Sequence, residues 1–481
     1  MANTLKHTPV ADIPAIHDKL HTTFKSGVTR PLEWRKQQLR QLARMFYENK
    51  DAIVHTLHLD LRKPDQEAAL MEVLGIIKGA KFALDHIDEW VKPTKPTVEQ
   101  SRAGWNCTIH TVPKGVICLI SPWNFPWVLT FKPLAGAIAA GCAVVLKPSE
   151  VTAHSAALMA ELVPKYLDPS AFVVINGAVP ETTAMLNLRW DHIFYTGGVA
   201  VGRIIAAAAA KFVTPLTLEL GGKSPVIIDE GIDLDLAARR ILNGRAVNAG
   251  QLCVSPDYSI VLRSVFPSFL EALTRANDVL FPDGPFHPDA KWAKIVNERH
   301  ADRLFNLLKG TKGKVYFGGK HQKLEDGVQI EPTVVVDVGL DDPLMEEEIF
   351  GPILPVLVAE NLDEAISIIN SLPKPLVIYP FTDNPMTKER ILSETNSGNI
   401  SFNDVTSILG FDELPFGGQG DSGYGSWHGH YTYKIFSQER VSIDVPASEE
   451  TALEIRYRPY TKEKYEALSG AVQHMYQSLQ Q

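Results

Sequence analysis

Hydrophobic positions near the start of the chain repeat at intervals of three and four residues. One apolar stripe, between residues 34 and 47, is formed by Leu39, Leu42, Met45 and Phe46. A second stripe continues toward Trp90 and is formed by Leu70, Val73, Leu74, Ile77 and Phe82. This spacing is the period of an amphipathic helix, so residues 12–90 are predicted to be mainly helical. A Pro-rich stretch at 92–96 is expected to end these helices.

From residue 112 onward the pattern changes to short β-branched runs that alternate with helical stretches. The predicted strands are 115–120, 143–146, 172–175 and 192–196, and the predicted helices between them are 129–140, 154–166 and 180–188. A second alternating set begins near residue 215, with strands at 216–220, 225–228, 334–336 and 353–358 and a helix at 234–248. Such alternation predicts βαβ units, so the expected fold class is α/β with parallel sheets.

Bulk composition narrows the kind of protein. The chain has 481 residues and is 45% hydrophobic, which is long enough for at least two packed domains. Its net charge of -9 comes from interspersed acidic and basic residues, which argues against a nucleic-acid surface. The longest apolar stretch, 134–146, is shorter than the roughly 20 residues of a membrane span. Four cysteines without a Cys-x-x-Cys pair indicate a reducing compartment, so a soluble cytoplasmic protein is expected.

One glycine motif is rejected on its context. The segment 418–423, Gly-Gln-Gly-Asp-Ser-Gly, matches the dinucleotide fingerprint Gly-x-Gly-x-x-Gly. That fingerprint requires a strand before it and a helix that opens inside it, whereas Glu-Leu-Pro-Phe precedes this segment and Tyr-Gly-Ser-Trp follows it. The segment is therefore interpreted as a glycine-rich loop.

Five other motifs occur together in a fixed order. They are Pro-Trp-Asn-Phe-Pro at 122–126, Lys-Pro-Ser-Glu at 147–150, Leu-Glu-Leu-Gly-Gly-Lys at 218–223, Gly-Gln-Leu-Cys at 250–253 and Glu-Ile-Phe-Gly-Pro at 348–352. With these motifs the chain resembles the aldehyde dehydrogenase superfamily, over residues 32–445. The finer match is similar to the class 3 branch and rests on segments 194–197, 253–258, 414–418 and 427–429.

The resemblance implies an architecture and partners. It implies a Rossmann-type nucleotide-binding domain at 1–87 and 112–215, and an α/β catalytic domain at 216–400. A small bridging and oligomerisation element would occupy 88–111 and 429–445, followed by a polar tail at 446–481. The cofactor would be NAD, with NADP as an alternative, and the substrate a fatty, aromatic or apocarotenal-like aldehyde. Class 3 relatives are commonly dimers, so a homodimer is expected.

Cys253 is the predicted nucleophile. A lone cysteine is commonly a small buried apolar residue, but the motif at 250–253 resembles the family's nucleophile motif. A thiolate that adds to an aldehyde creates an oxyanion, which needs hydrogen-bond donors that are already in place. By resemblance, the side chain of Asn124 and the backbone N–H of Cys253 provide them. Alternatively, Asn124 satisfies a turn between Pro122 and Pro126.

Glu219 is the predicted base that activates water to hydrolyse the resulting thioester. It lies in the apolar run 216–220, where burial would raise its pKa toward neutrality. The alternative is that Glu219 is a buried structural partner of Lys223.

The resemblance assigns the remaining motifs to the cofactor. Lys147 ends a predicted strand and Glu150 follows it, and both would contact the adenine-side ribose, where a carboxylate repels a 2′-phosphate. Glycines before an Ala-rich helix would admit a pyrophosphate to its N-terminus, and these are Gly197, Gly198 and Gly202. Many relatives have a hydroxyl or amide side chain where this chain has Gly198. The nicotinamide-side ribose and ring would contact Glu348 and Phe350.

The sequence disfavours three other functions and a metal site. A CoA-acylating relative would pass the thioester to CoA, and Glu219 argues against it. A cysteine hydrolase would leave Lys147, Glu150 and Glu348 without a role, and no motif supports a histidine near the nucleophile. A binding protein without catalysis is disfavoured because nucleophile, donor and base are all present. His428 and His430 lack the cysteine partners and spacing of a zinc site, so no metal is expected.

Overall fold

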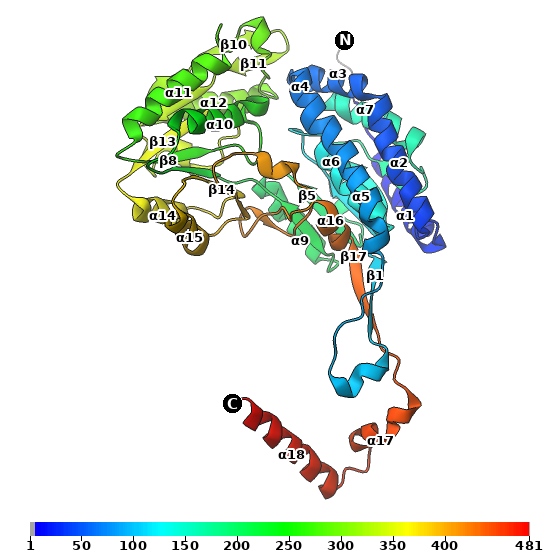
Figure 1. Cartoon of the computed structure of the whole chain (residues 1–481). Helices are drawn as coiled ribbons and strands as arrows, with labels where there is room; N and C mark the ends of the chain where they lie inside the picture. The colour runs from blue at the N-terminus through cyan, green and yellow to red at the C-terminus, as the bar shows by residue number, and fades with distance from the viewer. Residues whose placement is uncertain (1–4, 481) are drawn as a thin grey trace. The chain divides into compact units, whose positions relative to one another are not determined.

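The computed structural model describes residues 5–480, and their contacts divide the chain into two units (Figure 1). The first unit runs to Trp90 and resumes over Pro113–Gln438, and it contains the two large sheets. The second unit consists of Val91–Val112 and the residues from Glu439 onward. The strand and helix alternation predicted from the sequence is confirmed, and the fold class is α/β.

The chain begins with the predicted helices. They are α1 (Ile13–Ser26), α2 (Leu32–Glu48), α3 (Lys50–Leu61), α4 (Asp65–Glu67), the π-helix η2 (Ala68–Leu74) and α5 (Gly75–Trp90). The first predicted stripe is confirmed, because its four apolar side chains on α2 are fully buried. The second stripe is wrong in its first turn: Leu70 and Leu74 are 59% and 45% exposed, whereas Glu72 is buried. The π-helix explains this, because its i→i+5 hydrogen bonds shift which side chains share a face.

The first large sheet has six strands in the order β16-β6-β5-β2-β3-β4. Their bounds are β2 (Val116–Ile120), β3 (Ala143–Lys147), β4 (Phe172–Val174), β5 (His192–Thr196), β6 (Leu216–Glu219) and β16 (Gly423–Tyr424). All pairings are parallel except that of β16 with β6. Because β6 pairs with β5, this sheet extends past residue 215, where the sequence pattern had placed a domain boundary.

The helices of this sheet cover both of its faces. They are α6 (Val128–Ala140), α7 (Ala153–Tyr166), α8 (Val179–Leu186) and α9 (Val199–Ala210). Helices α2, α3 and α5 pack on α6 and α7, whereas α1 packs with α8 on the other face. The chain moves from β2 through β3 to β4 and then returns to β5 on the other side of β2. This reversal creates a switch point between β2 and β5, where ligands bind beyond the strand ends in open α/β sheets.

The second large sheet has seven strands in the order β15-β14-β7-β8-β13-β12-β9. Their bounds are β7 (Pro225–Ile228), β8 (Tyr258–Leu262), β9 (Lys314–Phe317), β12 (Thr333–Val336), β13 (Ile353–Ala359), β14 (Val377–Phe381) and β15 (Asn399–Ile400). A separate hairpin is formed by β10 (His321–Leu324) and β11 (Gly327–Ile330).

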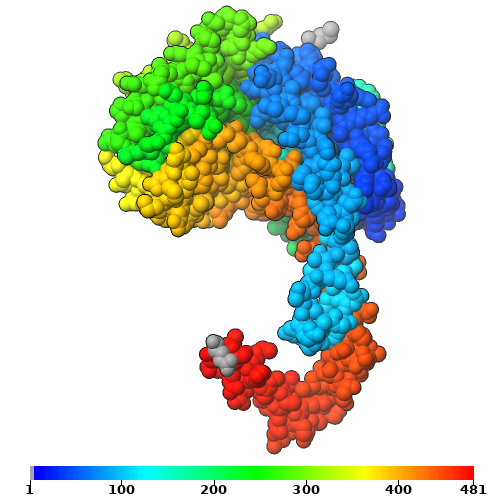
Figure 2. Space-filling view, in the orientation of Figure 1, coloured from blue at the N-terminus to red at the C-terminus, as the bar shows by residue number. Residues whose placement is uncertain are grey.

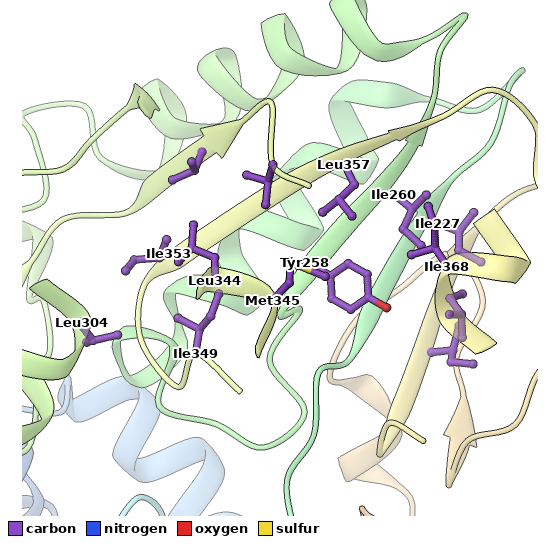
Figure 3. Close-up of a cluster of buried hydrophobic side chains, with 14 of the residues drawn as sticks. Ile227, Tyr258, Ile260, Leu304, Leu344, Met345, Ile349, Ile353, Leu357 and Ile368 are labelled. Atoms are coloured by element: carbon purple, nitrogen blue, oxygen red, sulfur yellow. The ribbon is translucent and has the colours of Figure 1, made fainter. Parts of the chain in front are cut away.

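Helices cover this sheet on both sides (Figure 1). They are α10 (Leu234–Ala246), α11 (Phe266–Leu280), α12 (Glu298–Gly310), α13 (Pro343–Glu346), α14 (Leu362–Ser371) and α15 (Pro385–Glu394). Figure 3 shows the core between strands and helices, including Tyr258, Ile260 and Leu357. Ile349 belongs to the same buried cluster, so the loop before β13 is anchored in this core.

The second unit contains a two-stranded ribbon and the C-terminal helices. Its elements are η3 (Gln100–Trp105), β1 (Thr108–Pro113), β17 (Ser437–Ser442), α17 (Glu450–Leu453) and α18 (Lys462–Ser478). The predicted bridging element, 429–445, differs from this unit at its start, because α16 (Gly429–Ile435) packs on α6 in the first unit.

The predicted polar tail ends in α18, which is red in Figure 2. This helix also has exposed apolar side chains, among them Tyr465, Leu468, Val472 and Met475. Across residues 5–480, no helix has both the length and the apolar character needed to span a membrane.

Candidate active site

Four predicted site residues lie at one edge of the six-stranded sheet. Strands β2, β3, β5 and β6 are parallel, so their carboxyl ends meet at the same edge. Asn124 follows β2, Lys147 ends β3, Gly197 follows β5 and Glu219 ends β6. The Gly197 N–H donates to the carbonyl of Glu219 at 3.0 Å, which joins the last two directly. The topology of the sheet therefore brings together residues that are almost 100 positions apart.

The loop that holds Cys253 begins where α10 ends, and its backbone is strained. The predicted helix 234–248 stops at Ala246, because Asn248 and Ala249 have φ of 50° and 51°. Gly250 follows with φ of 73°, and a Cβ there would lie 2.3 Å from the carbonyl oxygen of Gly351. Left-handed conformations at non-glycine residues are costly and persist where surrounding structure enforces them, as at active sites.

Asn124 is joined to this loop by hydrogen bonds. Its Nδ2 donates to the carbonyl of Gln251 at 3.1 Å, two residues before Cys253. In return, Nδ2 of Asn248 donates to the carbonyls of Asn124 and Gln251, at 3.0 and 3.2 Å. Asn124 is only 3% exposed. The amide thus has a fixed, buried position beside the loop of the predicted nucleophile.

Burial and two neighbouring carboxyl groups determine the electrostatics around the thiol. Burial raises the pKa of Cys253, and the charges of Glu348 and Glu219 raise it further. Burial also raises the pKa of Glu219 well above its ordinary value, which is the direction expected from the sequence. Glu219 is 3% exposed, and its Oε1 has no hydrogen-bond partner among the described residues. A buried carboxyl with a free oxygen is available to bind a water molecule or a proton.

The alternative role of Glu219 as a partner of Lys223 is wrong. The ammonium of Lys223 lies 2.5 Å from a carboxylate oxygen of Asp257 and 2.7 Å from the carbonyl oxygen of Leu344. These bonds direct Lys223 toward the seven-stranded sheet rather than toward Glu219.

Glu348 and Phe350 lie in a loop that reaches the same place from the seven-stranded sheet. A Cβ on Gly221, just after β6, would lie 1.9 Å from Oε2 of Glu348, so only glycine fits beside this carboxyl group. Burial and the neighbouring Asp257 raise the pKa of Glu348 to about 8. Phe350, with φ of 49°, packs edge to face on Trp123 at 5.4 Å between ring centroids. The loop therefore contacts Gly221, two residues after Glu219, and Trp123, the residue before Asn124.

Lys147 is buried, which distinguishes it from an ordinary surface lysine. Its side chain is 4% exposed, and its Nζ lies 3.4 Å from the carboxylate of Glu150, which is 39% exposed. Nζ also donates to the carbonyl of Pro148 at 2.8 Å, and burial lowers the pKa of this ammonium. A positive and a negative group thus stand together at the carboxyl end of β3.

The glycines before α9 leave the helix N-terminus open. Gly198 is the N-cap residue, and a Cβ built on it would meet no atom within 4 Å. Gly197 has no such room, because its Cβ would lie 2.2 Å from the Tyr195 hydroxyl. Gly202 lies in the first turn and donates its N–H to Gly198. Unpaired N–H groups at an uncovered helix N-terminus suit a pyrophosphate, so with Lys147 and Glu150 this edge fits a dinucleotide.

The rejected glycine motif forms a turn. Gly420 and Gly423 form an antiparallel bridge, and β16 follows as an edge strand on β6. No helix opens within residues 418–423, so this segment lacks the geometry of a phosphate-binding fingerprint.

The histidine pair has structural contacts. The ring of His428 is 2% exposed, and its Nδ1 lies 2.9 Å from the carbonyl oxygen of Phe411. Burial lowers the pKa of His428 well below its ordinary value. Across residues 5–480, no three His, Cys, Asp or Glu side chains are grouped to hold a metal.

Three charged residues that the sequence analysis did not single out contact the two loops of the site; Lys63 and Glu72 are fully buried, whereas Glu67 is half-buried. Lys63 donates to the carbonyl of Asn124, Glu72 accepts from the N–H of Trp127, and Glu67 accepts from the N–H of Asn248. The signal in the sequence was weak: two acidic residues stand in an otherwise apolar helical stretch.

Comparison with known proteins agrees with this geometry. Residues 3–441 match the sequence profile of the aldehyde dehydrogenase family. Aldehyde dehydrogenase family 3 member H1 of Arabidopsis thaliana is 41% identical over 457 residues, which cover 94% of this chain and 93% of that protein. The mouse protein named aldehyde dehydrogenase, dimeric NADP-preferring, is 41% identical over 451 residues, covering 94% of this chain and 98% of its own.

A solved structure extends the likeness to the fold. The substrate-bound AldH of Staphylococcus aureus superposes with a TM-score of 0.91 and is 34% identical, covering 96% of this chain and 99% of its own. The name of the Arabidopsis relative also agrees with the class 3 resemblance found in the sequence. Because the profile and the relatives cover more than nine tenths of the chain, this protein belongs to the aldehyde dehydrogenase family.

Proposed function

We propose that the chain oxidises aldehydes to carboxylic acids with NAD(P), through a covalent adduct on Cys253. One observation supports this most strongly: the strained loop of Cys253 is hydrogen-bonded to Asn124, which follows β2, and the buried carboxyl group of Glu219 ends β6 at the same edge of the sheet. The geometry combines a nucleophile, an oxyanion donor and a buried base.

Cys253 attacks the carbonyl carbon of the aldehyde as a thiolate, forming a C–S bond and an oxyanion. Because burial and two carboxyl groups raise its pKa, the thiol is protonated at rest and must lose its proton before attack. The Nδ2 of Asn124 and the N–H of Cys253 donate to the oxyanion. In the present structure Nδ2 donates to the Gln251 carbonyl, so a substrate oxygen would exchange for or share this bond.

Glu219 acts after the thioester has formed on Cys253. Burial raises its pKa, which makes its carboxylate a stronger base toward water, and its unpaired Oε1 is available to that water. The activated water adds to the thioester carbon, the C–S bond breaks, and the carboxylic acid leaves. Transfer to CoA would not require such a base, so a buried Glu219 favours hydrolysis.

Residues on the two sheets would hold the dinucleotide. Lys147 and Glu150 would bind the adenine-side ribose, and Gly197, Gly198 and Gly202 would admit the pyrophosphate to α9. From the other sheet, Glu348 and Phe350 would contact the nicotinamide half. The bound nicotinamide supplies the hydride acceptor for the oxidation.

The finer proposals concern substrate and assembly. We propose fatty, aromatic or apocarotenal-like aldehydes as substrates, in line with the class 3 resemblance. A homodimer is proposed because the mouse relative is named as dimeric. Light scattering of the purified protein should then give about twice the chain mass of 53.1 kDa. A cytoplasmic location is proposed because all four cysteines are free thiols.

A panel of aldehydes tests the proposed function. Purified protein is mixed with NAD and medium-chain, aromatic or apocarotenoid aldehydes, and NADH is followed by absorbance with and without CoA. The expected result is NADH and free acid in the absence of CoA. The matched control is Cys253→Ala, which should bind NAD but form no NADH. Strict dependence on CoA, or NADH formation by Cys253→Ala, would contradict the proposal.

A further inference from the structure

We propose that Lys63, Glu67 and Glu72 are positioning residues that set the distance between the Asn124 amide and the Cys253 thiol. This inference rests on the proposed function, because it concerns the oxyanion donor and the nucleophile of that reaction. Lys63 follows α3, Glu67 ends α4 and Glu72 lies within the π-helix η2. Their side-chain hydrogen bonds go to one another, to the loop of Asn124 and the start of α6 that follows it, or to the loop that leads to Cys253.

Lys63 binds the loop that carries Asn124. It is fully buried, and its Nζ donates to the carbonyl oxygen of Asn124 at 2.9 Å and to the carboxylate of Glu72. The same ammonium lies 3.7 Å from the ring centroid of Phe125. Two of the three contacts of this cation therefore restrain two successive residues of the loop, Asn124 and Phe125.

Glu72 fixes the other end of the same loop. Its Oε2 accepts from the backbone N–H groups of Trp127 and Val128, at 2.9 and 3.4 Å, where α6 begins. The residue is fully buried because the π-helix turns it inward, in place of the apolar neighbours Leu70 and Leu74. Such irregular helical turns are frequent at functional sites.

Glu67 connects this assembly to the nucleophile loop. Its Oε2 accepts from the N–H of Asn248 at 3.0 Å, at the first of the left-handed residues that lead to Cys253. The side chain of Asn248 then donates back to the carbonyl of Asn124 at 3.0 Å. Two loops that are more than 120 positions apart are thus tied to one helical segment of ten residues, 63–72.

Stability alone does not account for this arrangement. Removing two charges from water is costly, and an apolar pair of similar volume often stabilises a core at least as well. A buried ion pair is accordingly weak support for a purely stabilising role. Here the charged groups instead bind backbone atoms of the two loops that must meet the substrate, and small displacements of such groups slow catalysis greatly.

The first test removes both charges of the pair. In the double variant K63M/E72Q the glutamine can still accept from Trp127, but the carbonyl of Asn124 loses its ammonium donor. We expect NADH formation in a single turnover to fall about tenfold to a hundredfold. The Kd for NAD should stay within about twofold, because the contacts at β3 and α9 are unchanged. The matched control K132M/D412N removes another buried pair, 2.9 Å apart, and should retain the single-turnover rate.

The second test asks whether the role of Glu67 depends on the hydrogen bond that it accepts from Asn248. Glu67→Gln keeps an acceptor for the N–H of Asn248, whereas Glu67→Leu removes it. We expect Glu67→Gln to retain the single-turnover rate, and Glu67→Leu to slow both this rate and alkylation of Cys253 by iodoacetamide. Alkylation needs no oxyanion donor, so this reagent reports on the nucleophile loop alone.

The outcomes are distinguishable. A folded K63M/E72Q with the wild-type single-turnover rate would overturn the role of the pair, and equal rates for the two Glu67 variants would overturn that of Glu67. A parallel loss of NAD affinity would also contradict positioning. If K63M/E72Q does not fold, the comparison of the two Glu67 variants still tests whether this segment positions the loop of Cys253. Failure of the proposed function would show earlier, as a wild-type protein that forms no NADH.

Discussion

The two large sheets position their candidate site residues in different ways. On the six-stranded sheet, Lys147 and Glu219 are the last residues of regular parallel strands, and Gly197 follows another. On the side of the seven-stranded sheet, Cys253 and Phe350 belong to loops whose backbone includes left-handed residues. Strand ends place side chains through the topology alone, whereas an irregular loop must be held by specific contacts. The fold alone thus places Lys147, Gly197 and Glu219, whereas the position of Cys253 depends on individual hydrogen bonds.

The largest expected effect on the reaction rate comes from Asn124, which joins the six-stranded sheet to the loop of Cys253. Asn124→Ala removes the side-chain donor to the oxyanion and also the bond to the Gln251 carbonyl. Loss of one such donor typically slows acylation by about a hundredfold to a thousandfold. Rapid mixing with NAD and aldehyde should show this loss in the NADH burst, with NAD affinity unchanged. A burst rate within a few-fold of the wild type would remove Asn124 from the oxyanion site.

A matched pair of glycine substitutions tests the comparison itself. Gly250→Ala places a Cβ 2.3 Å from a backbone carbonyl at a φ of 73°, whereas Gly198→Ala adds one in open space. We expect Gly250→Ala to lower Tm by several degrees and the burst rate by roughly tenfold. Gly198→Ala should leave Tm within about 1 °C of the wild type. Equal tolerance at both positions would refute the idea that the nucleophile loop is the more constrained region.

At the carboxyl end of β3, the expected effect of a substitution is a change in the preference for NAD over NADP. The carboxylate of Glu150 would repel the 2′-phosphate of NADP, so the wild type should prefer NAD. Glu150→Gln should raise kcat/KM for NADP relative to NAD by about fivefold, as expected for one partly screened charge. A wild-type preference for NADP, or no relative gain in the variant, would show that Glu150 is not in the ribose site.

The smallest expected effect is a pH dependence of stability. The pKa of Glu348 in the folded protein, about 8, lies above the 4.5 of an unfolded glutamate. The folded state therefore holds this proton more tightly, and its free energy of unfolding falls as pH rises from about 5 to 8. Glu348→Gln cannot ionise, so its Tm relative to the wild type should rise by roughly 2 °C or more over this range. A constant difference in Tm would contradict the raised pKa.

The same contrast explains what the sequence predicted. The apolar run 143–146 places Lys147 at the end of a strand, as observed, whereas the predicted strand 216–220 extends one residue past Glu219, where β6 ends. Burial of Glu219 follows as well, because the run around it is apolar. The roles of these residues, and the domain bounds taken from the resemblance, remain predictions.

The positioning residues could not be predicted in this way. Lys63 and Glu72 each look like ordinary solvated charges, since the backbone groups that they bind in the loop of Asn124 lie 61 and 55 positions away along the chain. The π-helix also breaks the periodicity of the apolar stripe. The stripe predicts that Leu70 and Leu74 are buried, whereas Glu72 is the buried residue. Left-handed residues other than glycine have little signature in the sequence: asparagine is only enriched in this conformation, as at Asn248, and an alanine such as Ala249 gives no indication of it.

The most direct test of the central claim uses Glu219→Gln, because it separates formation of the thioester from its hydrolysis. The variant should release about one NADH per active site in a burst and then stall, with the acyl group on Cys253 visible by intact-protein mass. Steady turnover should fall by roughly a hundredfold, the usual worth of a positioned general base. Loss of the burst would mean that Glu219 is also needed to deprotonate Cys253. Unchanged steady turnover would contradict the account, because thioester hydrolysis would then not require this buried carboxyl group.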